Sequence, residues 1–114
     1  MTQTRQPLRE PTYFVLASLL DGPLHGYGVI KRAAELSHGR VRIRAGTLYG
    51  ALDRLIEEGW VAFDGEEVVD GRLRRYYRLT GAGEAALLAE ADRLRQAADI
   101  VQTRRAGRLE ERPA

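Results

Sequence analysis

The chain has 114 residues, a formal net charge of +2 at pH 7 and no cysteine. This length suits one domain with at most one appended element, and the lack of cysteine excludes disulfides and thiolate metal sites. No apolar run approaches the roughly 20 residues that a membrane span needs, and no apolar signal-peptide core follows the N-terminus. We therefore expect a small globular protein of the cytoplasm, without a membrane partner.

All but one of the 18 basic residues are arginine, and the isoelectric point is about 9.3. Arginine is the side chain that forks onto phosphates and guanine edges. A GC-rich genome also favours arginine codons, so the bias alone does not indicate a nucleic-acid partner. The positions of the arginines in the predicted elements decide between these two explanations.

Two helices are predicted after a polar N-terminal arm of residues 1–10. Pro11 suits the first turn of a helix, and the sequence Asp-Gly-Pro at 21–23 cannot continue it. Residues 25–36 place apolar side chains at helical spacing and predict a second helix. The segment 40–44 then alternates arginine with valine and isoleucine, which is typical of an extended chain with its arginines on one side.

A third helix is predicted from Ala45 to Glu58, where Gly59 is a usual C-terminal stop. Its apolar residues form one stripe along the helix, and they are Leu48, Leu52, Leu55 and Ile56. Such a stripe fixes a helix on the core of a domain and leaves its other faces free for a partner.

A hairpin and a long helix complete the chain. Residues 60–64 and 73–79 are aromatic and β-branched strands, and the acidic, glycine-flanked residues between them predict a turn. Thr80 is expected to cap a last helix over residues 81–105, which no proline interrupts. Residues 106–114 are expected to be a flexible polar tail.

This order of elements is the plan of a winged helix-turn-helix domain, expected over residues 11–80. The fold class is therefore mainly α with a small β-hairpin, followed by a long C-terminal helix. In this plan the third helix enters a major groove of DNA, and the hairpin touches the adjacent backbone or the minor groove.

The expected DNA-binding surface combines the third helix, with the segment before it, and the second strand of the hairpin. Its members are Arg42, Arg44, Gly46, Thr47, Tyr49, Gly50 and Arg54, together with Arg72, Arg74 and Arg75. Along a strand, Arg72, Arg74 and Arg78 point the same way as Tyr76, which makes a basic ridge fit for phosphates or a minor groove. The acids at the tip of the hairpin oppose phosphate, so the alternative of a charged strand edge that prevents aggregation stays open.

The last helix carries a seam with alternating spacings of four and three residues, formed by Leu87, Ala91, Leu94, Ala98 and Val101. A helix of 26 residues would extend roughly 39 Å, too far for so small a core to cover. The seam therefore predicts a homodimer, whose two-fold axis would match a palindromic DNA site. The alternative is that the helix packs back on its own domain.

Several stretches together resemble one known family: Leu24–Ile30 with its His-Gly-Tyr, Gly46–Tyr49, Ala51–Leu55 followed by Glu58-Gly59, Gly71-Arg72, and Arg75–Thr80. Over about residues 11–94 the chain resembles the PadR family of bacterial transcriptional regulators, in the branch with a single terminal helix. The resemblance implies a winged-helix dimer that represses transcription, often of its own operon or of detoxification and efflux genes.

The chain departs from that family at three places. The Ser-Pro that often precedes Gly-Thr-Leu-Tyr is Arg44-Ala45 here, and the common Pro after the Tyr is Gly50. Relatives that hold flat aromatic drugs between subunits use aromatic residues of the terminal helix, and this helix has none. We therefore do not expect that mode of binding an inducer.

Nothing in the sequence predicts an enzyme, a metal site or a cofactor. His25 and His38 lack further metal ligands at suitable spacing, and no glycine-rich phosphate loop follows a strand. We expect His25 to be a packed structural residue.

The alternative function is a winged-helix protein-interaction module that does not bind DNA, which the acidic hairpin tip and the modest net charge keep open. Binding to a palindromic duplex that falls steeply with salt would separate the two functions.

Overall fold

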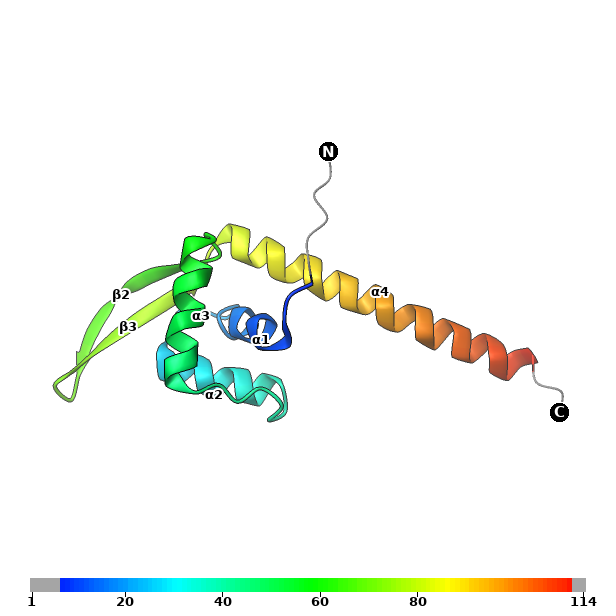
Figure 1. Cartoon of the computed structure of the whole chain (residues 1–114), viewed down its shortest axis with the longest axis horizontal. Helices are drawn as coiled ribbons and strands as arrows, with labels where there is room; N and C mark the ends of the chain where they lie inside the picture. Colours follow the sequence, from blue (N-terminus) through cyan, green and yellow to red (C-terminus); the bar gives the residue numbers. More distant parts are fainter. Residues whose placement is uncertain (1–6, 112–114) are drawn as a thin grey trace.

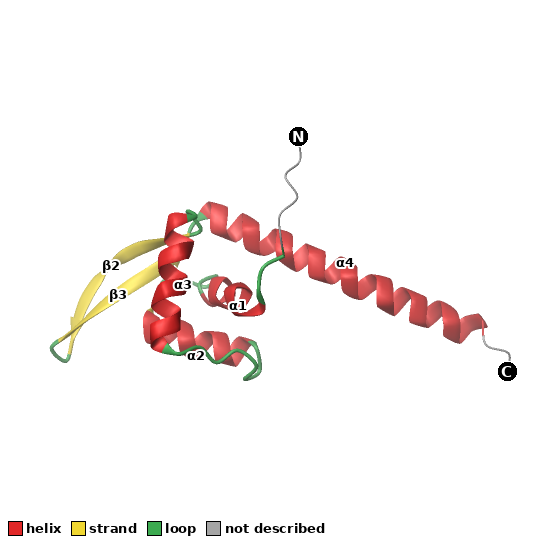
Figure 2. Cartoon of the chain, in the orientation of Figure 1, coloured by secondary structure: helices red, strands yellow, loops and turns green. Residues whose placement is uncertain are grey.

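The structure, a computed structural model, describes residues 7–111. Its elements in chain order are α1 (Glu10–Ser18), β1 (Leu24–His25), α2 (Gly26–Leu36), α3 (Ala45–Glu57), β2 (Val61–Val69), β3 (Arg72–Leu79) and α4 (Gly81–Glu111). Figure 1 shows α1, α2 and α3 gathered beside the base of the β2–β3 hairpin, with α4 extending away from them. The principal extents of 70 × 38 × 22 Å reflect this elongated shape. The expected class, mainly helical with a small sheet and a long C-terminal helix, is confirmed (Figure 2).

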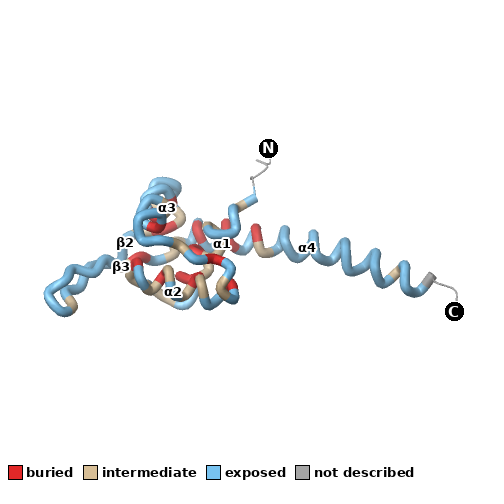
Figure 3. The backbone as a smooth tube through the Cα atoms, turned by 60° about the horizontal axis from the view of Figure 1, so that its bottom comes forward, coloured by how far each residue is buried: buried red, intermediate tan, exposed pale blue. Residues whose placement is uncertain are grey.

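The core lies where α1, α2, α3 and the base of the sheet meet. Its fully buried side chains come from each of these elements, and they include Leu16, Val29, Leu48, Leu52 and Val61. Figure 3 shows the buried residues concentrated in this part, while the hairpin and the distal half of α4 are exposed. Both projecting elements are thus free to meet partners.

The helices α2 and α3 lie within one residue of their predicted bounds, because each buries one clear apolar stripe. The first helix ends earlier than its apolar spacing suggests, at Ser18, whose hydroxyl donates to the Val15 carbonyl at 2.6 Å. The segment 40–44 is not a strand, although its alternation persists, with Val41 buried and the arginines exposed. Among residues 7–111, no strand pairs with this segment.

The sheet has three strands in the order β1-β3-β2, and β1 was not predicted. This strand has two residues, too few to show an alternating pattern, and it pairs with β3 through Leu24↔Tyr77 and His25↔Tyr76. The imidazole of His25 packs edge-on against the Tyr76 ring, with 5.6 Å between centroids. His25 is therefore a packed residue, as expected.

The hairpin is longer, and its turn shorter, than predicted. Asp70 and Gly71 have φ values of 51° and 74°, which make a two-residue turn of the kind that Asp-Gly favours. The expected turn over residues 65–71 is wrong, because Gly65, at φ 107°, occupies an irregularity in β2 between Phe63 and Glu66 instead. A glycine inside a strand often marks such a bulge.

Thr80 caps α4 as predicted: the Gly83 amide donates to its hydroxyl oxygen at 3.0 Å, and the hydroxyl donates to the Gly59 carbonyl at 2.6 Å. A Cβ at Gly83 would overlap the Trp60 carbonyl oxygen, so only glycine fits this start of the helix. The helix then runs to Glu111 rather than to about Arg105. The expected tail is thus helical over 106–111, since one glycine costs a helix only about 1 kcal/mol, and residues 112–114 lie outside the described part.

Within residues 7–111, no helix is both long and apolar enough to cross a membrane. The expected N-terminal arm is described only from Pro7 onward, and residues 1–6 lie outside the described part.

Candidate nucleic-acid interface

The N-terminal half of α3 presents an open backbone face. Leu48 and Leu52 are fully buried, so the helix side opposite them points outward. Gly46 and Gly50 lie on that outward side, one helical turn apart, and a Cβ at either would have no neighbouring atom within 4 Å. A large rigid partner can therefore approach the α3 backbone closely at these two positions.

Tyr49 lies on one flank of this face and is about half exposed. Its phenol rests against Gly26, the first residue of α2. Burial raises the pKa of Tyr77, and the neighbouring Tyr49 phenol raises it further. Tyr49 thus joins three elements, α2, α3 and β3, beside the open face.

The C-terminal half of α3 has a different character. Asp53 and Glu57 are exposed near its outward side, one turn apart. Thr47 and Arg54, seven residues apart, lie on the flank opposite Tyr49. Arg54 lines a groove of about 440 Å³ together with the N-terminal segment and the Trp60 side of the domain. The carboxylates oppose an anionic partner, so the N-terminal half of α3 is the part suited to one.

The three arginines before α3 are not equivalent. Arg40 forms an ion pair with Glu10 at 2.9 Å, and the Arg42 Nε atom donates to the Gly39 carbonyl at 3.1 Å. Arg44 is the residue before the first turn of α3 and is exposed, and no ion pair within residues 7–111 involves it. Among the described residues, Arg44 is thus a cation at the start of α3 without an ion-pair partner.

The arginines of the wing, which is the β2–β3 hairpin, also differ in whether they form ion pairs. Arg75 pairs with Glu66 at 3.6 Å, and Arg78 pairs with Asp64 at 3.4 Å. For Arg72 and Arg74 there is no ion pair in the described part of the chain, although Glu67 is the cross-strand neighbour of Arg74. The free cations of the wing are thus close to its tip.

The register also settles which face each arginine occupies. Tyr77 is buried in the core and contacts Phe63, with 5.4 Å between the ring centroids. Alternation along β3 places Arg75 on that core-side face, whereas Arg72 and Arg74 lie on the opposite face with Tyr76. Arg72, Arg74 and Arg78 thus share one strand face with Tyr76, as the expected basic ridge requires, and Arg75 does not belong to that ridge.

A family model described as the transcriptional regulator PadR-like family matches residues 15–89, a span that contains both α3 and the wing. The chain belongs to the PadR-like family of transcriptional regulators. It is not an enzyme family, which agrees with the sequence-based expectation. The transcriptional regulator Rv3488 of Mycobacterium tuberculosis is 39% identical over 84 residues, which make up 74% of this chain and 75% of that protein.

Solved structures agree with this assignment. A PadR-like transcription factor from Bacteroides fragilis has a TM-score of 0.67 and 27% identity, and the match covers 81% of this chain and 86% of that chain. Bacillus subtilis PadR, solved in complex with operator DNA, has a TM-score of 0.62 and 24% identity, over 71% of this chain and 46% of that chain. The second likeness is one of fold.

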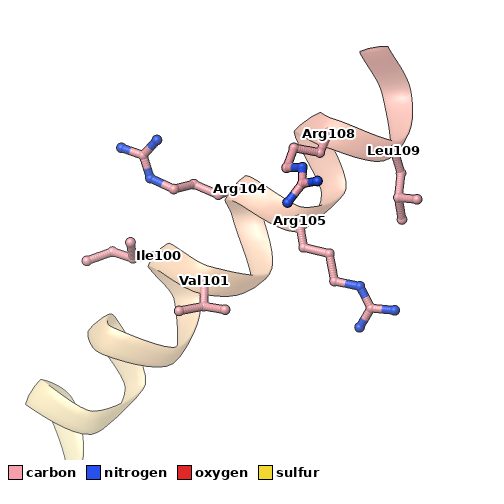
Figure 4. Close-up of a pocket in the computed structure, with 6 residues that line it drawn as sticks. All are labelled: Ile100, Val101, Arg104, Arg105, Arg108 and Leu109. Carbon is pink, nitrogen blue, oxygen red and sulfur yellow. The ribbon is translucent and has the colours of Figure 1, made fainter. Parts of the chain in front are cut away.

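In this PadR-like chain the predicted helical seam is partly internal. Leu87 is 3% exposed and belongs to the core of its own domain, so its expected place in a dimer interface is wrong. The first turns of α4 pack on α1, so that part of the seam is covered by its own domain. Ala91 is half-buried, whereas Leu94, Ala98 and Val101 are exposed. Figure 4 shows the distal end, where Val101, Arg105 and Leu109 project to one side of α4, and Figure 1 shows this end of α4 extending away from the other elements.

Glu90 is a buried carboxylate that the sequence did not single out. It accepts two hydrogen bonds from Arg93, from Nε at 2.8 Å and from Nη2 at 2.7 Å. These bonds lower the pKa of the Glu90 carboxyl against the opposing effect of burial, and a hydrogen bond from the Leu8 backbone amide lowers it further. Glu90 thus links Leu8, in the segment that leads into α1, to the first half of α4.

Tyr27 was missed as a surface residue. It occupies the first turn of α2, is 70% exposed, and lies one turn before the exposed Lys31. The signal was present in the sequence, since residues 27 and 31 share the polar face of the predicted helix. Both lie on the same helix as Gly26, which Tyr49 contacts.

Proposed function

We propose that the chain is a dimeric repressor that binds a palindromic operator in double-stranded DNA. The observation that carries the proposal is the open face of α3 at Gly46 and Gly50, with arginines at both ends of the surface that form no ion pair within residues 7–111. Arg44 stands at the start of α3, and Arg72 and Arg74 stand on the wing. A duplex has its phosphates on both sides of the groove that such a helix would enter.

The charge distribution supports entry of α3 by its N-terminal end. Backbone amides near Gly46 and Thr47 suit a phosphate, helped by the helix dipole. Asp53 and Glu57, further along, favour a tilt that keeps the C-terminal half of α3 away from the DNA backbone. The complex of Bacillus subtilis PadR with operator DNA supports the same partner for this chain.

The proposed contacts divide into two groups. Thr47, Tyr49, Gly50 and Arg54 would face base edges, because they surround the open face of α3. Backbone contacts would come from Arg42, Arg44, Gly46, Arg72, Arg74 and Arg75. Of these, Arg42 and Arg75 would first give up the intramolecular partners described above.

The proposed dimer uses the distal part of α4. This helix has 31 residues and is about 46 Å long, and only its beginning is covered by its own domain. Leu94, Ala98 and Val101 remain exposed, with Ala91 at the edge of the covered part. A second copy of α4 would bury them and place two winged domains about a two-fold axis, acting on DNA in the cytoplasm.

The test is selection of bound genomic fragments by the purified protein, followed by footprinting and a transcription assay. The proposal expects a symmetric footprint with half-sites about 34 Å, or a multiple of that, apart. It also expects an affinity that falls steeply with salt, and lower transcription from a promoter that carries the selected site. If no duplex is selected, the winged-helix interaction module becomes the better description.

A further inference from the structure

The tip of the wing carries an exposed aliphatic pair. Val68 of β2 and Leu73 of β3 are directly opposite in the register, next to the last pair before the turn. Their side chains are 70% and 55% exposed. Figure 1 shows the hairpin extending beyond the helices, so its own domain offers no cover at this end. Two apolar side chains held together in water at the end of a projecting element indicate a contact surface.

The pair occupies the face of the wing that continues from the core. Leu73 alternates with Arg75 and Tyr77 along β3, and Tyr77 lies in the core beside α3. The ion pair between Glu66 and Arg75 separates the aliphatic pair from the core and leaves little net charge between them. This face is therefore apolar at its tip and leads back along β3 to Tyr77, which lies in the core with residues of α3.

The opposite face of the tip is cationic. Arg72 and Arg74 lie there, beside Leu73 in sequence and on the other side of the pleat. The wing tip thus offers two different surfaces, one suited to phosphate oxygens and one suited to apolar carbon. A DNA minor groove presents both, because its walls are the C–H surfaces of deoxyriboses and its rims are phosphates.

We infer that the Val68–Leu73 pair packs against the deoxyribose wall of the minor groove that flanks the α3 site, while Arg72 and Arg74 hold phosphates at its rim. This inference rests on the proposed DNA-binding function and adds a second kind of contact to it. The pair lies on the wing face that leads back along β3 to Tyr77 in the core, and the neighbouring arginines complement the charge of the rim. A narrower groove brings its walls closer to the tip, so the pair favours flanks that are rich in A·T.

The contact has a physical signature of its own. Neutralising a phosphate releases counterions and makes binding depend on salt, whereas burying aliphatic surface does not. The aliphatic pair therefore contributes affinity at every salt concentration, and the arginines contribute mainly at low salt. Substitutions in the two groups can be told apart by the slope of affinity against salt.

The experiment compares the wild-type protein with the double variant Val68→Thr/Leu73→Thr on the selected operator over a range of salt. Threonine keeps the β-branched shape of Val68 and is favoured in strands at both positions, while it removes apolar surface. We expect roughly tenfold weaker binding with an unchanged salt slope. The matched control is Leu20→Thr, a leucine that is 48% exposed in the turn after α1, which should bind like the wild type. Thermal melting confirms that each variant is folded.

A shortened duplex that ends at the edge of the α3 site gives the second arm. The wild type and the double variant should bind it equally, because the flanking groove is gone. Equal affinity for the full operator, a reduced salt slope, or a difference that persists on the short duplex would each overturn the inference, and the last would point to contact with another protein copy. Failure of the wild type to bind either duplex would instead overturn the proposed DNA-binding function.

Discussion

The phenol of Tyr49 rests on the backbone of Gly26: a Cβ added at Gly26 would lie 2.6 Å from the Tyr49 hydroxyl oxygen and 2.9 Å from the ring carbon Cζ. The two residues belong to the His-Gly-Tyr and Gly-Thr-Leu-Tyr motifs, which are separate in sequence. The glycine of the first motif makes room for the tyrosine of the second. This contact holds the flank of α3 against the start of α2.

Gly26→Ala is therefore expected to displace Tyr49 and to weaken operator binding. Alanine alone would stabilise a helix by up to about 1 kcal/mol, but the overlap should cost roughly 1–3 kcal/mol and lower the melting temperature. Gly28→Ala is the control on the same helix, because its Cβ would meet its nearest neighbour at 3.4 Å. In the background of Tyr49→Ala the Gly26 substitution should cost little, and full additivity of the two losses would refute the coupling.

The wing arginines should separate by their ion pairs. Arg72→Ala and Arg74→Ala should each weaken binding to operator and scrambled duplex alike and lower the salt slope by about one unit. Arg75→Ala should have a smaller effect, because Glu66 already holds its guanidinium. Affinities measured across salt concentrations check this. If the slope of affinity against salt is unchanged in both the Arg72 and the Arg74 variant, the ridge is a solvated surface that does not contact phosphates.

Local periodicity explains which parts of the fold were predictable. The stripe of α3 and the cap at Thr80 depend on residues a few positions apart, and both were found from the sequence. Strand β1 has no such pattern, since its two residues become a strand only by pairing with Tyr76 and Tyr77.

The candidate site shows the same limit. The sequence identified the basic residues, but their ion pairs depend on which acids the fold brings near them. Arg40 meets Glu10, which is 30 residues away, and Arg75 meets Glu66 across the hairpin. The helical seam likewise could not show that Leu87 is buried in the core of its own domain. The heptad spacing is the same for packing within a domain and for packing between two chains.

Leu94→Asp is expected to convert the proposed dimer to a monomer. Leu94 is 42% exposed in a single chain, so its own domain tolerates a charge there, whereas a carboxylate buried in an interface costs several kcal/mol unless it is paired. Sedimentation measures the change. Leu87→Asp is the contrasting variant and should unfold the domain, because Leu87 is 3% exposed. A Leu94 variant that is still dimeric at micromolar concentration would show that this part of α4 is not the interface.

The Glu90 carboxylate should make stability depend on acid. Its pKa is lowered in the folded state by Arg93 and the Leu8 amide, so its stabilising contribution is present above the ordinary carboxyl pKa of 4.5 and is lost as the pH falls through the lower folded value. Glu90→Gln should therefore melt at a lower temperature than the wild type at pH 7. The gap should close in the acid range below the ordinary pKa. Glu57→Gln, on exposed α3, should match the wild type throughout, and a constant gap for Glu90→Gln would exclude the charge as its cause.

Arg54 and Tyr49 are the residues of α3 that we expect to select the DNA sequence. Arg54 has two opposed roles open to it: a fork onto a guanine, worth about 1–3 kcal/mol of discrimination, or a surface pair with Glu57 or Glu58, worth a few tenths. Among the described residues neither of these acids pairs with it, which leaves its guanidinium available to DNA.

Arg54→Ala and Tyr49→Ala should therefore lose much more affinity for the selected operator than for a scrambled duplex. Arg54→Ala should leave the melting temperature nearly unchanged, because its side chain is exposed, while Tyr49→Ala should lower it through the lost contact with Gly26. Tyr49→Phe separates the ring from the hydroxyl: a phosphate contact by the hydroxyl would be lost in it, and packing on a thymine methyl would be kept. Equal losses on both duplexes would show that Arg54 and Tyr49 contact the DNA backbone and not the bases. No loss on either would mean that α3 does not read DNA, and a protein partner would then be sought for its open face.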